Sequence, residues 1–220
     1  MKTDLTELIF ILDRSGSMGG LESDTIGGFN AMLKKQQAEP GECRITTVLF
    51  DDKFEMLHDR IDLKAVSPLT QEEYFVRGST ALLDAVGRTI TKIVGVQKNT
   101  APDYRAEKVL FVITTDGMEN ASREFSHNKV KAMIERQKAK YGWEFVFLGA
   151  DIDAVDVAAS IGIGKNRAQN FHKDREGIAL NYCVVSEALA SFRSAPRGAK
   201  LDDSWSQEIE ADYKRRGGKR

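Results

Sequence analysis

The stretch Leu8-Ile-Phe-Ile-Leu-Asp13-Arg-Ser-Gly-Ser17 decides the fold of this chain. Its first five residues are all apolar, which is typical of a strand buried on both faces in a parallel sheet. The apolar run stops at Asp13 and a polar loop follows. Apolar residues then return at helical spacing, at Ile26, Phe29 and Leu33. The stretch therefore predicts a strand, a loop and a helix, with oxygen-bearing side chains in the loop.

Further apolar runs predict the rest of a sheet. Residues 109–113 and 145–148 have the same wholly apolar character as the first strand. Residues 45–50 predict another strand, and a tight turn at 51–52 leads into residues 54–57, which predicts an antiparallel hairpin at one edge. Because these strands alternate with helical patterns, we expect an α/β fold with a mostly parallel sheet and helices on both faces.

Three helix starts can also be predicted from capping residues. Ser126, Asp153 and Asp174 each precede a segment with apolar residues at helical spacing. Ser and Asp side chains accept hydrogen bonds from the unpaired N–H groups of a first helical turn. We therefore expect these three residues to be N-caps.

The last 27 residues, from Ser194 onward, have no clear apolar periodicity and end in a basic run. The sequence therefore predicts one domain over residues 1–193 and a charged, flexible tail over residues 194–220. The tail contains one Arg-Gly-Gly, a weak pointer to RNA or DNA. A solvated end is the commoner role of such a run, so we expect no nucleic-acid binding.

Composition indicates a soluble globular protein, with 41% apolar and 30% charged residues. Lys plus Arg at 32 nearly balances Asp plus Glu at 33, so no net charge draws the chain to nucleic acid or to an anionic membrane. No signal segment or membrane-spanning stretch is predicted. Cys43 and Cys183 are expected to be buried free thiols, which favours a reducing cytoplasm.

Oxygen-bearing side chains gather at the predicted strand ends, where ligands of open α/β sheets bind. They come from residues 13–17, 78–80 and 115–117. Two carboxylates and three hydroxyls suit Mg²⁺, which takes about six oxygen ligands and few carboxylates. His and Cys, which zinc and copper favour, are absent from these loops. The sequence predicts a divalent-cation site made by Asp13, Ser15, Ser17, Thr80 and Asp116.

The motifs DRSGSM, RGSTALLDA and ITTDGMEN resemble the metal-ion-dependent adhesion site of von Willebrand factor type A (vWA) domains. The resemblance covers residues 4–193, and it is to intracellular members of bacterial or phage type. It implies an open, Rossmann-like sheet of six strands with one antiparallel edge strand. The neighbourhood of Phe171 is the candidate for the sixth strand.

The resemblance also implies roles for the site residues. Ser15, Ser17 and Thr80 would bind the cation through their hydroxyls, and Asp13 and Asp116 would act directly or through water. The cation would be Mg²⁺, with Mn²⁺ or Ca²⁺ as alternatives, and a partner's Asp or Glu carboxylate would complete its shell. The implied function is a non-enzymatic protein-interaction module, and complexes of ATPases or of stress responses are the expected partners.

Simpler roles and another function class compete with this interpretation. Asp13, the two serines and Thr80 could each be a helix cap, and Asp116 could begin an ordinary turn. The alternative function is a metal-dependent phosphoryl-transfer or hydrolytic enzyme with Asp13 as nucleophile. Such chemistry generally needs a second acid two residues later, where this chain has Ser15. We therefore expect no enzyme.

Residues beside the predicted ligands are candidates for contacts with a partner. Arg14 and Met18 lie in the same loop and are expected to be exposed. Met118 and Glu119 follow Asp116 and are expected to shape the rim of the site.

Overall fold

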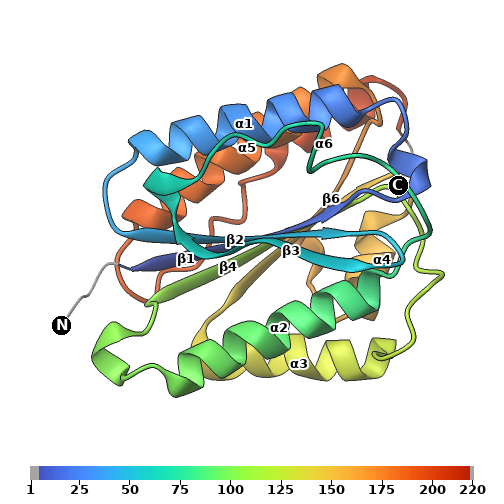
Figure 1. Cartoon of the computed structure of the whole chain (residues 1–220). Helices are drawn as coiled ribbons and strands as arrows, with labels where there is room; N and C mark the ends of the chain where they lie inside the picture. The colour runs from blue at the N-terminus through green and yellow to red at the C-terminus, as the bar shows by residue number, and fades with distance from the viewer. Residues whose placement is uncertain (1–4, 219–220) are drawn as a thin grey trace.

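The structure, a computed structural model, describes residues 5–218 and contains one six-stranded sheet with helices on both faces (Figure 1). The strands are β1 (Thr6–Asp13), β2 (Cys43–Phe50), β3 (Phe54–Asp62), β4 (Lys108–Thr115), β5 (Glu144–Ala150) and β6 (Ala168–Phe171). The helices are α1 (Glu22–Ala38), α2 (Leu82–Asn99), α3 (His127–Tyr141), α4 (Ala154–Ser160), α5 (Arg175–Ser194) and α6 (Gln207–Arg215). Short 3-10 turns are η1 (Gly16–Met18), η2 (Leu63–Ala65), η3 (Pro102–Tyr104) and η4 (Lys165–Arg167). Within residues 5–218, no helix is both long and apolar enough to span a bilayer.

The sheet has the strand order β3-β2-β1-β4-β5-β6. All neighbouring strands are parallel except β3, which runs antiparallel to β2 at the edge. This confirms the predicted mostly parallel sheet and its edge hairpin. The strand β6, which ends at Phe171, confirms the sixth strand.

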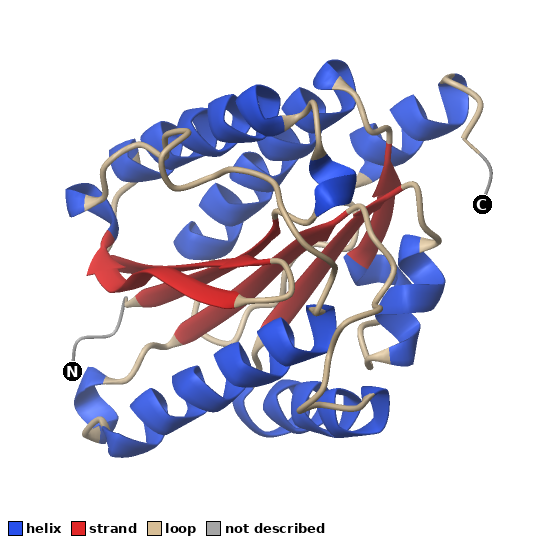
Figure 2. Cartoon of the chain, turned by 45° about the vertical axis from the view of Figure 1, so that its right-hand side comes forward, coloured by secondary structure: helices blue, strands red, loops and turns tan. Residues whose placement is uncertain are grey.

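Two apolar layers hold the helices to the sheet. Every residue of β1 and of β4 is buried, because these central strands are covered on both faces. Leu8 and Phe10 of β1 face one layer, which α1 and α5 cover, while Ile9 and Ile11 face the other, which α2 and α3 cover (Figures 1 and 2). The continuous apolar run of β1 is thus explained by burial on both sides.

The three predicted N-caps are present. Ser126 accepts a hydrogen bond from the backbone N–H of Lys129, and Asp174 accepts one from Gly177. Asp153 accepts from two backbone N–H groups at the start of α4. The two cysteines are free, but only Cys43 is buried, while Cys183 lies on the exposed side of α5, contrary to the expectation for that residue.

The segment after residue 193 differs from the predicted flexible tail. Leu201, Trp205 and Ile209 are buried, at 4%, 8% and 1% exposure, and α6 packs on β6 and α5. The Trp205 indole N–H also donates to the backbone carbonyl of Asn166. Leu201 and Trp205 lie in the coil and turn before α6, and Ile209 lies in α6, so that no single helical period connects them and the many charges between them hide them in the sequence. Residues 219 and 220, the end of the predicted tail, lie outside the described residues.

Candidate metal centre

Parallel strands bring the predicted site residues to one edge of the sheet. β1 and β4 are neighbours in register, with Leu12 opposite Thr114, so both strands end at the same level. Asp13 is the last residue of β1, and Asp116 directly follows β4. Thr80 lies just before α2 and reaches the same place. Three distant stretches of chain therefore meet there.

Short contacts join four of the five predicted residues. Ser15 Oγ and Ser17 Oγ are 2.9 Å apart, and the Thr80 hydroxyl donates to Ser15 Oγ at 3.1 Å. The Ser17 hydroxyl donates to Asp116 Oδ1 at 2.6 Å. Four oxygen atoms from three segments thus form a continuous cluster. None of these hydroxyls makes a side-chain cap at η1 or at α2, so the simpler capping role does not apply to them.

Asp13 lies behind this cluster and positions it. Its side chain is 1% exposed. Asp13 Oδ1 accepts from the backbone N–H of Ser15 at 2.6 Å, and Oδ2 accepts from the Thr115 hydroxyl at 2.5 Å. Burial raises the pKa of Asp13 to about 6, although these hydrogen bonds counteract the shift. A nearby cation would favour the ionised form of this carboxyl.

The oxygen cluster fits a small, hard cation. Oxygens at neighbouring corners of an octahedron around Mg²⁺ are about 2.9 Å apart, given metal–oxygen distances near 2.0–2.1 Å. The spacings from Ser15 Oγ to Ser17 Oγ and to Thr80 Oγ1, 2.9 and 3.1 Å, match this value. Asp116 Oδ2 is buried and has no hydrogen bond. Over residues 5–218 no three His, Cys, Asp or Glu side chains gather as a metal site, so this one depends on hydroxyls.

Gly117 keeps the space beside the cluster open. A Cβ atom at this position would lie 2.6 Å from Thr80 Oγ1 and 3.2 Å from Ser17 Oγ. The first distance is far below van der Waals contact, so any side chain would displace the threonine hydroxyl. The glycine after Asp116 is thus required by the oxygen cluster.

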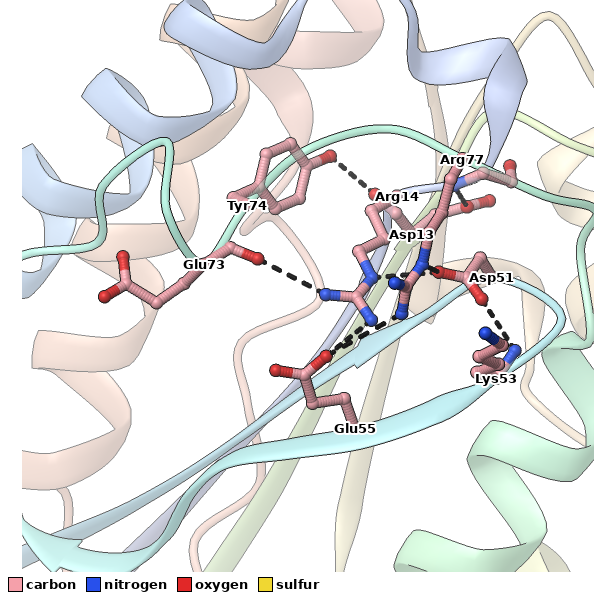
Figure 3. Close-up of polar contacts among 9 residues, drawn as sticks. Asp13, Arg14, Asp51, Lys53, Glu55, Glu73, Tyr74 and Arg77 are labelled. Atoms are coloured by element: carbon pink, nitrogen blue, oxygen red, sulfur yellow. Dashed lines mark hydrogen bonds and ion pairs between the residues drawn. The ribbon is translucent and has the colours of Figure 1, made fainter.

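The expectation that Arg14 is an exposed partner contact is wrong. Its side chain is fully buried and reaches the edge hairpin (Figure 3). Arg14 Nε donates to Asp51 Oδ2 at 3.0 Å and Nη2 donates to Glu55 Oε2 at 2.6 Å, while Arg77 Nε donates to the same Asp51 oxygen at 2.7 Å. A buried guanidinium requires such paired carboxylates. Arg14 therefore fastens the loop that carries Ser15 and Ser17 to the edge hairpin of β2 and β3.

One more contact fixes the same loop. The Tyr74 hydroxyl donates to the backbone carbonyl of Asp13 at 2.6 Å (Figure 3). Met18 is also buried, at 4% exposure, and so, like Arg14, it is no surface contact. An apolar side chain in a polar loop is the sequence signal that could have placed Met18 inward. No local signal shows where Arg14 finds its carboxylates, because its partner Asp51 is 37 positions away.

The loop after β4 forms the rim, as expected for Met118 and Glu119. Met118 is 70% exposed. The Glu119 carboxylate points back into the molecule, where it accepts from the backbone N–H of Leu83 at 2.8 Å and from Ser122. Of this pair, only Met118 is therefore available to a partner.

A lysine that the sequence did not predict lies at the site. Lys173 follows β6, and its Nζ is 2.9 Å from Asp116 Oδ2 and 3.7 Å from Asp151 Oδ2. The first contact is an ion pair without the alignment of a hydrogen bond. This pairing could not be predicted from the sequence, because Lys173 and Asp116 follow two different strands, β6 and β4, with β5 between them in the sheet.

No protein-family model matches this sequence, and a search of curated proteins finds no significant match. Solved structures do resemble it. The von Willebrand factor domain of the type V pili tip protein Mfa5 from Porphyromonas gingivalis has a TM-score of 0.64 at 12% identity, over 91% of this chain and 99% of that chain.

Two metal-bearing structures are also similar. Proximal thread matrix protein 1 from the mussel byssus, with a zinc-occupied MIDAS motif, has a TM-score of 0.57 at 12% identity over 86% of this chain and 46% of that chain. Manganese-loaded TRAP protein from Plasmodium vivax has a TM-score of 0.51 at 20% identity, over 66% of this chain and 57% of that chain. This chain thus spans about half the length of the mussel protein. It has the fold of a von Willebrand factor type A domain.

Proposed function

We propose that this chain is a divalent-cation-dependent protein-interaction module. Ser15, Ser17, Thr80 and Asp116 would hold the cation, and Asp13 would support them from behind. The observation that carries the proposal is the continuous cluster of oxygen atoms from three segments, spaced at 2.6–3.1 Å. Mg²⁺ is the proposed cation, and Mn²⁺ or Ca²⁺ could replace it.

The donor set explains why such a site would bind a partner. Neutral hydroxyls provide three of the donor groups, and they leave much of the charge of a divalent ion unneutralised. An anionic oxygen from outside would therefore be attracted to the ion. We propose that the partner is a protein that presents an Asp or Glu carboxylate, and that Met118 contacts the residues around it. The metal-bearing mussel and Plasmodium structures support the choice of a divalent cation.

A non-enzymatic role fits the surroundings of Asp13 better than phosphoryl transfer or hydrolysis. Both carboxylate oxygens of Asp13 accept hydrogen bonds, and the side chain is 1% exposed. A nucleophile must reach its substrate, and this carboxylate is covered. Its hydrogen bonds with Ser15 and Thr115 suit a supporting role. The free thiols Cys43 and Cys183 support a reducing compartment, and we propose the cytoplasm.

Calorimetric titration with Mg²⁺ and Mn²⁺ tests the cation site. We expect wild type to bind one ion and Asp116→Asn and Ser17→Ala each to bind at least about tenfold more weakly, which corresponds to about 1.4 kcal/mol. Ser79→Ala is the matched control, because Ser79 is an exposed serine next to Thr80. Equal affinities for wild type and Asp116→Asn, or no binding by wild type, would reject the site.

Capture of partners from a lysate tests the interaction itself. The full chain should retain a protein in Mg²⁺ that EDTA releases, and Asp116→Asn should not retain it. Mutating the acidic residues of the captured protein should abolish the capture. Capture that is the same with and without EDTA would contradict the proposed role of the cation.

A further inference from the structure

The loop between β6 and α5 places a fixed positive charge at the metal site. Lys173 Nζ lies 2.9 Å from Asp116 Oδ2, whereas the Ser17 hydroxyl donates to the other carboxylate oxygen, Oδ1. Asp116 is fully buried at its side chain, and Lys173 is only 24% exposed. Such a pair is much less screened by solvent than the ion pairs on the surface. The lysine therefore belongs to the electrostatics of the site.

The C-terminal segment holds this loop in place. Asp174, the residue after Lys173, pairs with Arg216 just beyond α6. On the other side of Lys173, His172 Nε2 is 3.1 Å from the backbone carbonyl of Tyr213, and the two rings are 4.7 Å apart. Both neighbours of the lysine are thus fastened to α6 or to the residue that follows it. The segment from α6 to Arg216 thus positions the Lys173 ammonium group that faces Asp116.

The formal charges show what the lysine would do. Among the proposed ligands only Asp116 carries a negative charge. If Asp13 behind them is counted as well, the two carboxylates formally balance a divalent ion, so that a loaded site without the lysine has a net formal charge of zero. With Lys173 the formal charge becomes +1, which Asp151 offsets only in part, because its carboxylate lies 3.7 Å from Lys173 Nζ and is 65% exposed to solvent. The extra charge weakens the binding of a cation and strengthens the attraction of an anion, because both act within a few ångströms and away from bulk water. Lys173 therefore shifts the site from holding metal tightly toward accepting a carboxylate.

We propose that Lys173, held in place by α6, is a positioning and specificity-determining residue of the metal site. It fixes Asp116, weakens the binding of the divalent ion and increases the affinity of the loaded site for the partner's carboxylate. This proposal rests on the proposed cation-dependent function and adds to it a residue from a separate strand end. It also gives the C-terminal segment a role in binding.

Manganese titration of Lys173→Met tests the charge effect. We expect Lys173→Met to bind Mn²⁺ about tenfold more tightly than wild type, because the variant removes a positive charge next to Asp116. Lys173→Arg keeps the charge and should bind Mn²⁺ within about twofold of wild type. Lys165→Met, which removes an exposed lysine from η4, is the matched control and should leave the affinity unchanged. Circular dichroism checks that each variant is folded.

A second readout separates the charge effect from a merely structural one. Glutarate added to the Mn²⁺-loaded protein should displace metal-bound water and lower the water-proton relaxation rate. This decrease should be smaller in Lys173→Met than in wild type at the same glutarate concentration. Arg216→Ala, which removes the ion pair between α6 and Asp174, should shift both readouts in the same direction as Lys173→Met and by a smaller factor.

The outcomes distinguish the two proposals. Equal Mn²⁺ affinities for wild type and Lys173→Met, with both binding, would overturn the role of Lys173 and leave the proposed function intact. Weaker binding by Lys173→Met would overturn it as well. No Mn²⁺ binding by wild type would contradict the proposed function, and the role of Lys173 would fall with it.

Discussion

At the residue scale, a substitution of Gly117 is the most direct single-residue test of the oxygen cluster. We expect Gly117→Ala to weaken Mn²⁺ binding by at least about tenfold, because the new methyl group would overlap Thr80 Oγ1 at 2.6 Å. Calorimetry measures the affinity, and thermal unfolding in EDTA measures the stability without metal. The loss of affinity should exceed any loss of stability, since the clash falls on the hydroxyl cluster.

Gly27→Ala is the matched control for this substitution. Gly27 lies in α1, and a Cβ atom there has no heavy atom within 4 Å. Ala is the better helix former by about 1 kcal/mol, so the control should be as stable as wild type or slightly more stable. Unchanged metal binding in Gly117→Ala would mean that the cluster does not hold the ion.

The sequence predicted the site residues that lie within a motif and missed those that do not. Asp13, Ser15 and Ser17 share one loop with fixed spacing, and the other two predicted residues stand in short motifs of their own. Lys173 stands in no motif, and the buried position of Arg14 depends on Asp51 and Glu55 from the edge hairpin. Charges that find partners only after folding leave no local pattern.

At the element scale, the start of α2 anchors the loop that follows β4. The Asp84 carboxylate accepts hydrogen bonds from the backbone N–H groups of three successive residues, Arg123, Glu124 and Phe125. Burial raises the pKa of Asp84, but these donors and Arg88 outweigh burial, so that the pKa lies below its ordinary value of 3.8. One side chain therefore organises the loop at the rim of the candidate metal site.

We expect Asp84→Asn to lower the free energy of unfolding by about 1.5 kcal/mol at pH 7, the lower end for hydrogen bonds to a charged group. Because the folded pKa of Asp84 lies below the unfolded value, its contribution is present above pH 3.8 and is lost as the pH falls through the folded pKa. Urea denaturation should thus show a difference in unfolding free energy between wild type and variant that becomes smaller below pH 3.8.

Glu124→Gln is the control for Asp84→Asn. Glu124 pairs with Arg88 on the surface, where water screens the charges, so this variant should be nearly as stable as wild type. If the difference in unfolding free energy between wild type and Asp84→Asn stays constant down to pH 2, the stabilisation does not come from the ionised Asp84 carboxylate.

The long strands could be predicted from the sequence more easily than the short strand β6. β1 and β4 are continuous apolar runs because they are buried on both faces, and such runs are visible in a sequence. β6 has only four residues, Ala-Gln-Asn-Phe, and two of them are polar. Its position came from the family resemblance, since four residues are too few to show a period.

At the scale of the whole molecule, the order of strands and helices could be predicted, but the extent of the packed domain could not. The segment after residue 193 shows no apolar periodicity among its mixed charges, although Leu201, Trp205 and Ile209 belong to the core. Three apolar residues among many charged ones give a weak pattern in sequence. They become a packing face only when β6 and α5 offer a surface to cover.

We expect Ile209→Ala to lower the free energy of unfolding by about 2–4 kcal/mol, as for other large-to-small changes in a core. Ile209 is 1% exposed, so the substitution leaves a cavity against β6 and α5. Urea denaturation measures the change. Glu208→Ala alters the exposed neighbour and should have little effect. Equal stability of Ile209→Ala and Glu208→Ala would show that α6 does not belong to the cooperative unit.

The contact of Arg216 with Asp174 also decides where the protein can be labelled. A fluorophore attached beside Arg216 would lie next to the loop that carries Lys173, at the same edge of the sheet as the candidate metal site. The start of β1 lies at the opposite end of the sheet from Asp13 (Figure 1). Immobilisation on the side of the molecule where β1 begins would thus leave the candidate metal site facing the solution, while coupling beside Arg216 would crowd it.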